Sequence, residues 1–145
     1  MHEKVLANQY HSFIDEDKPF FFNVSQLALG DGSDSNHLNI MVTSRSLMAN
    51  CEHDGVFHID GTYKLTKNRF PMLVFGITSI RGEFHPIAYN ITSHEKQSDF
   101  VNFFSAISIL ADEMEVDFDP DYLMMDSSDA TYNAAEKVLN CNFFC

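Results

Sequence analysis

The sequence has few basic residues, few cysteines and no long apolar run. It holds 9 Lys and Arg residues against 21 Asp and Glu residues, which gives a net charge of −12. Proteins that bind nucleic acid on their own usually present a basic face to the phosphates. A role on nucleic acid therefore needs metal ions, a local basic patch or segments outside this chain.

The scarcity of cysteine and of long apolar segments limits where the chain can work. Its 3 cysteines, Cys51, Cys141 and Cys145, are odd in number and unevenly spaced, which argues against a disulfide framework and for a reducing compartment. No apolar stretch approaches the length of about 20 residues that a membrane-spanning helix needs, and the first residues do not resemble a secretory signal. The sequence therefore predicts an intracellular protein without a membrane segment or a targeting signal.

The composition is that of a folded domain. The chain has 145 residues, a hydrophobic fraction of 45% and 14 phenylalanines, which is enough for the core of one domain. Residues 1–37 have the weakest pattern, and we expect them to form a partly ordered N-terminal extension with a helix over 5–14, a strand over 20–24 and a loop over 30–36. The pattern sharpens from residue 38, so residues 38–145 are predicted to form the main domain.

From residue 38 onward, the apolar spacing predicts a regular order of strands and helices. Apolar residues from Phe100 to Met114 follow the i, i+3, i+4, i+7 spacing of a helix, which Ser98 is expected to open. Arg81-Gly82 is a hairpin signal, so the strands around it should form an antiparallel meander. The predicted elements are a strand over 38–42, a helix capped by Ser44 that runs to about 51, strands over 56–65, 71–80 and 84–92, the helix from 98, a strand over 122–125, a helix over 129–139 capped by Ser127 or Ser128, and a strand from 142.

Two aspartates lie in or directly after apolar strands. Period-2 alternation places His58 and Asp60 on one face of the strand over 56–65, with Phe57 and Ile59 on the core side. Asp126 directly follows the apolar residues 122–125. A carboxylate in such a place is costly unless it has a partner or a metal ion. The two aspartates therefore suggest a divalent-cation site of the kind that two-metal phosphoryl-transfer enzymes use.

The order of elements predicts an α/β fold with a ribonuclease H-like mixed sheet. In that topology, a three-stranded antiparallel meander is followed by parallel strands and flanking helices, and the first strand lies at the centre, next to the fourth. Asp60 on the first strand and Asp126 at the end of the fourth would then meet. The last strand begins at Asn142 and the sequence ends at Cys145, so we expect the sheet to be incomplete at its C-terminus.

The residues around these aspartates resemble the transposase domain of mutator-like elements (MULEs). The resemblance covers residues 38–145, and it rests on Asp60-Gly61-Thr62-Tyr63-Lys64, on Pro86-Ile87-Ala88-Tyr89, and on Met125-Asp126 with Ala130, Asn133 and Ala134. It implies a ribonuclease H-like core that cleaves and transfers DNA strands with Mg²⁺ or Mn²⁺ held by three acids. Asp60 matches the first of these acids and Asp126 the second.

The resemblance also implies parts that this chain does not contain. The third acid of the family lies on a later helix, past Cys145, and Cys145 itself matches the cysteine of a Cys-x-x-His element. The chain thus resembles a C-terminally truncated piece, for which we expect weak turnover or none. DNA, a further copy of the chain and a nuclear location are implied by the resemblance alone.

Each of these signals also has a plainer interpretation. Asp60 can be a structural acid that pairs with Lys64, and Asp129, an acid at a helix N-terminus, rivals Asp126. Gly61 either lets another backbone approach closely or marks a bulge. Three functions therefore stay open: a transposase catalytic fragment, a non-enzymatic derivative that binds DNA or protein, and another ribonuclease H-like nuclease.

The histidines near the aspartates are expected to be structural. His58 shares a face with Asp60, where we expect a half-buried polar position. His94 and Glu95 are not expected to form a metal pair, because adjacent residues on a strand point to opposite faces. We expect His94 at the surface or at an edge.

Overall fold

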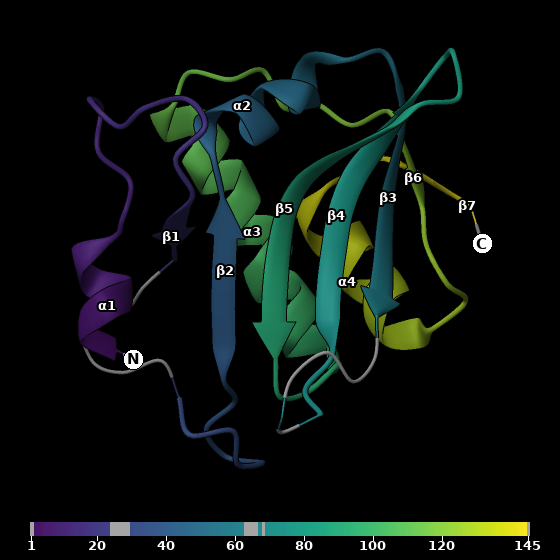
Figure 1. Cartoon of the computed structure of the whole chain (residues 1–145). Helices are drawn as coiled ribbons and strands as arrows, with labels where there is room; N and C mark the ends of the chain where they lie inside the picture. Colours follow the sequence, from purple (N-terminus) through teal and green to yellow (C-terminus); the bar gives the residue numbers. More distant parts are fainter. Residues whose placement is uncertain (1, 24–29, 63–66, 68, 145) are drawn as a thin grey trace.

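The computed structural model describes residues 2–23, 30–62, 67 and 69–144. Within these residues, seven strands form one mixed sheet in the order β1-β2-β5-β4-β3-β6-β7 (Figure 1). Helices α3 and α4 contact each other and lie on one face of the sheet. The end of the first predicted strand at Val24, the predicted pairing of Asp60 with Lys64 and the predicted role of Cys145 fall outside the described residues.

The elements follow the predicted order, and the fold is α/β as predicted. The strands are β1 (Phe20–Phe22), β2 (Asn39–Thr43), β3 (Gly55–Thr62), β4 (Met72–Ser79), β5 (Phe84–Thr92), β6 (Tyr122–Met124) and β7 (Asn142–Phe144). The helices are α1 (His2–Ala7), α2 (Arg45–Met48), the 3₁₀ turn η1 (Ala49–Glu52), α3 (Gln97–Glu113) and α4 (Asp129–Val138). β3, β4 and β5 form the predicted antiparallel meander, and none of the helices found in the described residues is long and apolar enough to cross a membrane.

The predicted helix over 5–14 is wrong in its bounds, because α1 ends at Ala7. The side-chain amide of Asn8 donates to the Lys4 carbonyl at 2.7 Å, which satisfies a carbonyl at the end of the helix. The Asn8 carbonyl accepts a hydrogen bond from the Phe21 amide at 2.8 Å, and Gln9 forms a parallel bridge with Phe21. Asn8 and Gln9 therefore pair with β1 instead of continuing α1, although the local sequence pattern predicts a helix there.

Two predicted helix caps are confirmed. Ser44 precedes α2, and its Oγ accepts a hydrogen bond from the Leu47 amide at 3.2 Å. Ser128 precedes α4, and its Oγ accepts from the Thr131 amide at 3.2 Å. Each hydroxyl satisfies one of the amides that have no partner inside the helix, which is the usual reason for serine at this position.

The start of α3 differs from the prediction. The helix begins at Gln97, one residue before Ser98. The carboxylate of Asp99 reaches back and accepts a hydrogen bond from the Lys96 amide at 3.0 Å. The first turn of α3 is therefore stabilised by an aspartate inside the helix rather than by a serine ahead of it.

An aromatic cluster between α3 and the sheet forms the centre of the core. Phe75 on β4 is fully buried. Its ring centroid lies 5.6 to 6.5 Å from those of Phe57, Phe103, Phe104 and Phe118, a separation at which tilted and edge-to-face rings attract one another. These contacts fix the apolar stripe of α3 to β3 and β4, the strands next to the site.

β3 lies between antiparallel β4 and parallel β6, as predicted. Its alternation is also as predicted, because Phe57 and Ile59 are buried whereas His58 is half-buried and Asp60 is exposed. β6 pairs in parallel with β7 in turn. The carboxyl ends of β3 and β6 therefore meet at one edge of the sheet, the lower edge in Figure 1.

Candidate functional site

β3 and β6 run parallel, and Asp60 and Asp126 lie near their carboxyl ends. His58 on β3 pairs with Met124 on β6. Continuing this register by two residues takes one chain to Asp60 and the other to Asp126, and neighbouring strands in a sheet lie about 4.8 Å apart. Both aspartates are exposed, as the alternation requires. We infer that the two acids lie side by side at the lower edge of the sheet.

The carboxylate of Asp126 lies against the start of α4. Its Oδ1 accepts hydrogen bonds from the Ser128 amide at 3.4 Å and from Thr131 Oγ1 at 3.3 Å. The N-terminus of a helix favours a negative charge. Asp126 and Asp129 both lie near the start of α4, and Asp129 is an exposed acid in its first turn. Asp126 is nevertheless the acid that continues β6, so the register favours it over its rival.

A third carboxylate approaches the end of β3. Glu95, in the connection between β5 and α3, places its Oε1 2.8 Å from the point where a Cβ on Gly61 would stand. The register of β3 with β4 continues through Gly61, opposite Leu73, so Gly61 does not mark a bulge. The glycine instead leaves room for a side chain, and its own amide donates to Asp60 Oδ1 at 2.9 Å.

His58 lies on the same face as Asp60 in the half-buried position that the sequence predicts. Its ring meets that of Phe84 edge to face, with 6.2 Å between the centroids. Burial lowers the pKa of His58 below its usual value, because a charged imidazolium is poorly solvated there. The neutral imidazole is therefore favoured near neutral pH, and His58 adds little positive charge beside Asp60.

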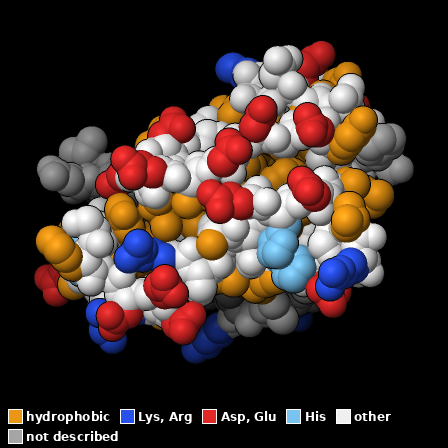
Figure 2. Space-filling view, turned by 90° about the horizontal axis from the view of Figure 1, so that it is seen from above, with side chains coloured by type: hydrophobic (Ala, Val, Ile, Leu, Met, Phe, Trp, Pro, Cys, Tyr) orange, Lys and Arg blue, Asp and Glu red, His pale blue; other side chains and the backbone are white. Residues whose placement is uncertain are grey.

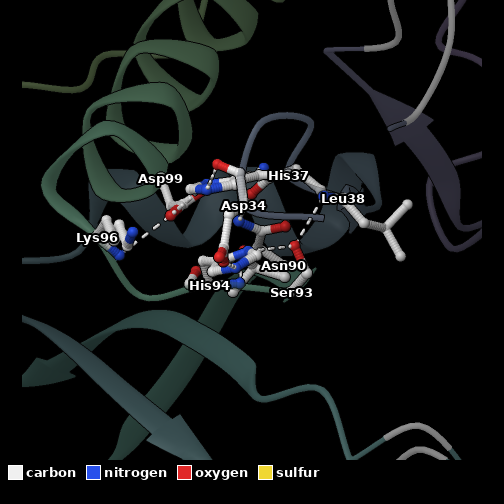
Figure 3. Close-up of polar contacts among 10 residues, drawn as sticks. Asp34, His37, Leu38, Asn90, Ser93, His94, Lys96 and Asp99 are labelled. Atoms are coloured by element: carbon white, nitrogen blue, oxygen red, sulfur yellow. Dashed lines mark hydrogen bonds and ion pairs between the residues drawn. The ribbon is translucent and has the colours of Figure 1, made fainter. Parts of the chain in front are cut away.

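A polar network holds the connection from which Glu95 extends (Figure 3). The rings of His37 and His94 stack with their centroids 3.8 Å apart. His37 Nδ1 lies 2.9 Å from the buried carboxylate of Asp99, and His94 Nε2 lies 2.9 Å from the exposed carboxylate of Asp34. His94 lies just after β5, and its side chain is 17% exposed, so it is half-buried and agrees only in part with the predicted surface or edge position. The network ties the loop before β2 to the start of α3.

Acidic side chains lie at both ends of the sheet, since Asp60, Asp126 and Asp129 are exposed at the carboxyl ends of β3 and β6 and at the start of α4. Figure 2 views the end opposite to the two aspartates, where Asp and Glu side chains gather. Five acids line one hollow at that end: Glu52, Asp54, Asp117, Asp119 and Asp121. Three exposed basic residues lie on the connections that follow β3 and β5, at the end with the two aspartates: Lys67, Arg69 and Lys96.

The donors at the candidate site suit a hard divalent cation. Carboxylate oxygens are the ligands that Mg²⁺ and Mn²⁺ prefer in proteins, and Asp60 and Asp126 supply them from adjacent strands. No three His, Cys, Asp or Glu side chains in the described part of the chain are grouped so as to hold a metal ion. The donor set therefore fits the cation in kind, with two acids in place of the three that the resemblance implies.

A family model of the MULE transposase domain matches residues 56–141. The match spans more than half of the chain and includes both aspartates. The chain belongs to the MULE transposase family. The matched part of this MULE domain contains nearly all of β3 and every element from there to α4, which together carry the candidate site. No curated protein and no solved structure matched the chain.

For two residues, the sequence analysis did not predict a position beside the aspartates of this MULE domain. Thr131 carries a usable signal, because it lies three residues after the predicted cap Ser128, where a hydroxyl faces back towards the start of the helix. Glu95 carries no such signal. Glu95 follows β5 and Gly61 lies near the end of β3, so only the order of the strands in the sheet brings them together.

Proposed function

We propose that this domain is the ribonuclease H-like catalytic core of a DNA transposase, in which Asp60 and Asp126 hold Mg²⁺ or Mn²⁺. The observation that carries the proposal is the parallel pairing of β3 with β6, which directs both acids to one edge of the sheet inside the family match. The strand order β5-β4-β3-β6-β7, a meander followed by two parallel strands, supports the ribonuclease H-like fold.

In this proposal, the two aspartates hold the divalent cation and fix its position at the end of the sheet. Asp60 carries carboxylate oxygens near the end of β3, and Asp126 carries them two residues after β6. Ions held there would supply the activation of a water or a 3′-hydroxyl and the stabilisation of the leaving oxygen in a displacement at phosphorus. Two carboxylates carry at most two negative charges against the four positive charges of two ions, so we expect weak metal binding and weak turnover or none from this chain alone.

DNA would approach the end of the sheet with the two aspartates, where Lys67, Arg69 and Lys96 are exposed basic residues on the connections that follow β3 and β5. Exposed acids lie at that end as well, among them Asp60, Asp126 and Asp129. The net charge of −12 makes association dependent on a divalent cation. Binding to DNA, assembly with a further copy of the chain and a nuclear location belong to this proposal and rest on family membership.

A non-enzymatic derivative is the second candidate. It is favoured by the net charge of −12 and by the lack, within the described ranges, of a three-residue metal group. Such a protein would keep the sheet and use its surfaces for contacts with DNA or protein. A ribonuclease H-like nuclease acting on RNA or single strands would use the same two acids and would differ only in its substrate.

Metal titration tests the first proposal directly. Mn²⁺ is titrated by calorimetry into the wild-type chain, into Asp60→Asn and into Asp126→Asn, each shown to be folded by circular dichroism. Asp119→Asn is the matched control, because Asp119 is an exposed acid at the opposite end of the sheet. We expect binding by the wild type and the control, and its loss in both site variants.

A DNA assay then separates the candidates. Fluorescence anisotropy with a labelled duplex is expected to show association in Mn²⁺ and none in EDTA, and nicking of supercoiled plasmid, where it occurs, should disappear in Asp60→Asn. Mn²⁺ binding that both site variants retain would refute the assignment of the two acids. A folded wild type that binds no Mn²⁺ would favour the non-enzymatic derivative.

A further inference from the structure

The hydrogen bonds of Asp126 distinguish its two carboxylate oxygens. Oδ1 accepts from the Ser128 amide at 3.4 Å and from Thr131 Oγ1 at 3.3 Å. For Oδ2, no hydrogen bond is found to any residue that the structure describes. We infer that Thr131 is a positioning residue that engages Oδ1 of Asp126 and leaves Oδ2 as the single oxygen offered to a divalent cation. This inference rests on the proposed function.

The direction of each hydroxyl proton follows from the partners. An ionised carboxylate only accepts hydrogen bonds, so Thr131 Oγ1 must donate its one proton to Asp126. In the 2.8 Å contact between the two hydroxyls, Ser128 Oγ is then the donor and Thr131 Oγ1 the acceptor. Ser128 Oγ in turn accepts from the Thr131 amide at 3.2 Å. The result is a chain of donors that ends on Asp126, in which each bond polarises the next.

Burial makes Thr131 suited to this task. Only 1% of the residue is exposed, so its hydroxyl is held by the surrounding side chains and not by solvent. Its branched side chain has few rotamers in a helix, and α4 fixes the backbone to which it is attached. Thr131 thus restricts the rotation of the Asp126 carboxylate, which is otherwise exposed at the end of β6.

Asp60 shows the same division of its oxygens. Its Oδ1 accepts from the Gly61 amide at 2.9 Å, and its Oδ2 has no hydrogen bond to the residues with described positions. Within the described residues, each aspartate thus has one oxygen that accepts hydrogen bonds from the backbone or the helix start and one that accepts none. This arrangement favours ligation through Oδ2 of each acid.

A merely structural role must be told apart from a positioning role, because Ser128 and Thr131 also stabilise the start of α4. Three variants of the 145-residue chain make the distinction. Thr131→Val keeps the shape and removes the hydroxyl, whereas Thr131→Ser keeps the hydroxyl. Glu136→Gly places a glycine at an exposed position of α4, which weakens the helix without touching the donors to Asp126.

Mn²⁺ is the probe, with its affinity measured by calorimetry and its position by the broadening of amide signals near Asp60 and Asp126 in NMR spectra. We expect Thr131→Val to weaken the affinity about tenfold, as the loss of a partner behind a metal ligand usually does. Thr131→Ser should retain the wild-type affinity. Glu136→Gly should melt at a lower temperature than the wild type and still bind Mn²⁺ equally well.

The outcomes separate this inference from the proposed function. Equal affinity of the wild type and Thr131→Val overturns the inference and leaves the proposed function standing. Weaker binding in Glu136→Gly, in proportion to its lower melting temperature, also overturns the inference, because helix stability then accounts for the effect. A folded wild type that shows neither heat nor broadening overturns both together.

Discussion

Replacing Gly61 by alanine tests whether this glycine makes room for Glu95. The added Cβ would stand 2.8 Å from Glu95 Oε1 and 3.7 Å from Leu73 Cδ2. The first distance is too short, but it involves the end of a flexible side chain, and the second is an ordinary contact. We therefore expect the backbone of β3 to keep its place while the carboxylate of Glu95 turns away from the end of the strand.

The expected change in the free energy of unfolding is less than about 1 kcal/mol. Alanine restricts the unfolded chain, which favours the fold by about 0.4–1 kcal/mol, and turning a half-exposed Glu95 offsets this by on the order of 0.5 kcal/mol. Gly55→Ala on the same strand gives the contrast, because its Cβ would overlap the carbonyl oxygen of Thr78. There the pairing of β3 with β4 must open, which costs about 3 kcal/mol or more.

Urea unfolding followed by circular dichroism measures both variants, and a double-mutant cycle with Glu95→Ala isolates the contact. In the Glu95→Ala background the clash is gone, so Gly61→Ala should be more favourable there by about 0.5–1 kcal/mol. The reasoning fails if Gly61→Ala loses as much stability as Gly55→Ala. It also fails if the effect of Gly61→Ala is the same in both backgrounds.

The core, a buried thiol and a surface pair give three more expectations. Phe75→Ala should lower the free energy of unfolding in urea by about 3–5 kcal/mol, because the ring is fully buried; a loss below about 1 kcal/mol would contradict the packing. Burial raises the pKa of Cys51 to about 12, so mass spectrometry after iodoacetamide treatment at about pH 8 should find this thiol unlabelled in the folded protein and labelled in urea. The hydrogen bond from His94 lowers the pKa of Asp34. The stability that Asp34 adds over Asp34→Asn should thus be full above about pH 4 and be lost as the pH falls through the lowered pKa; equal urea midpoints of the two proteins at about pH 6 would count against the pair.

The neighbourhood of β3 could be predicted from the sequence because local and global signals agree there. The alternation from Phe57 to Asp60 fixes which side chains enter the core, and a shift by one residue would reverse every face. The short turns between β3, β4 and β5 leave a meander as the simplest pairing, and a helix of 17 residues before β6 permits a parallel crossover. The parallel pairing that directs the two aspartates to one edge follows from these signals together.

The errors arise where a distant contact decides the local structure. α1 ends early because Asn8 and Gln9 pair with Phe21 on β1. The ring of His94 is partly covered because His37, which precedes β2, stacks on it. Neither partner is close in sequence, so periodicity and propensity within one window carry no trace of the contact.

The two aspartates are not explained by stability alone. Within the described residues, Asp60 is an exposed acid on a central strand whose carboxylate accepts one hydrogen bond, from the amide of the next residue. Acidic residues are disfavoured in strands, and a hydroxyl would accept the same bond without the charge. Asp126 accepts the hydrogen bonds from the start of α4, those of the Ser128 amide and the Thr131 hydroxyl, through Oδ1 only. What both acids have in common is a second oxygen without a hydrogen bond to the described residues, near the carboxyl ends of β3 and β6. The proposed cation would give that oxygen a use.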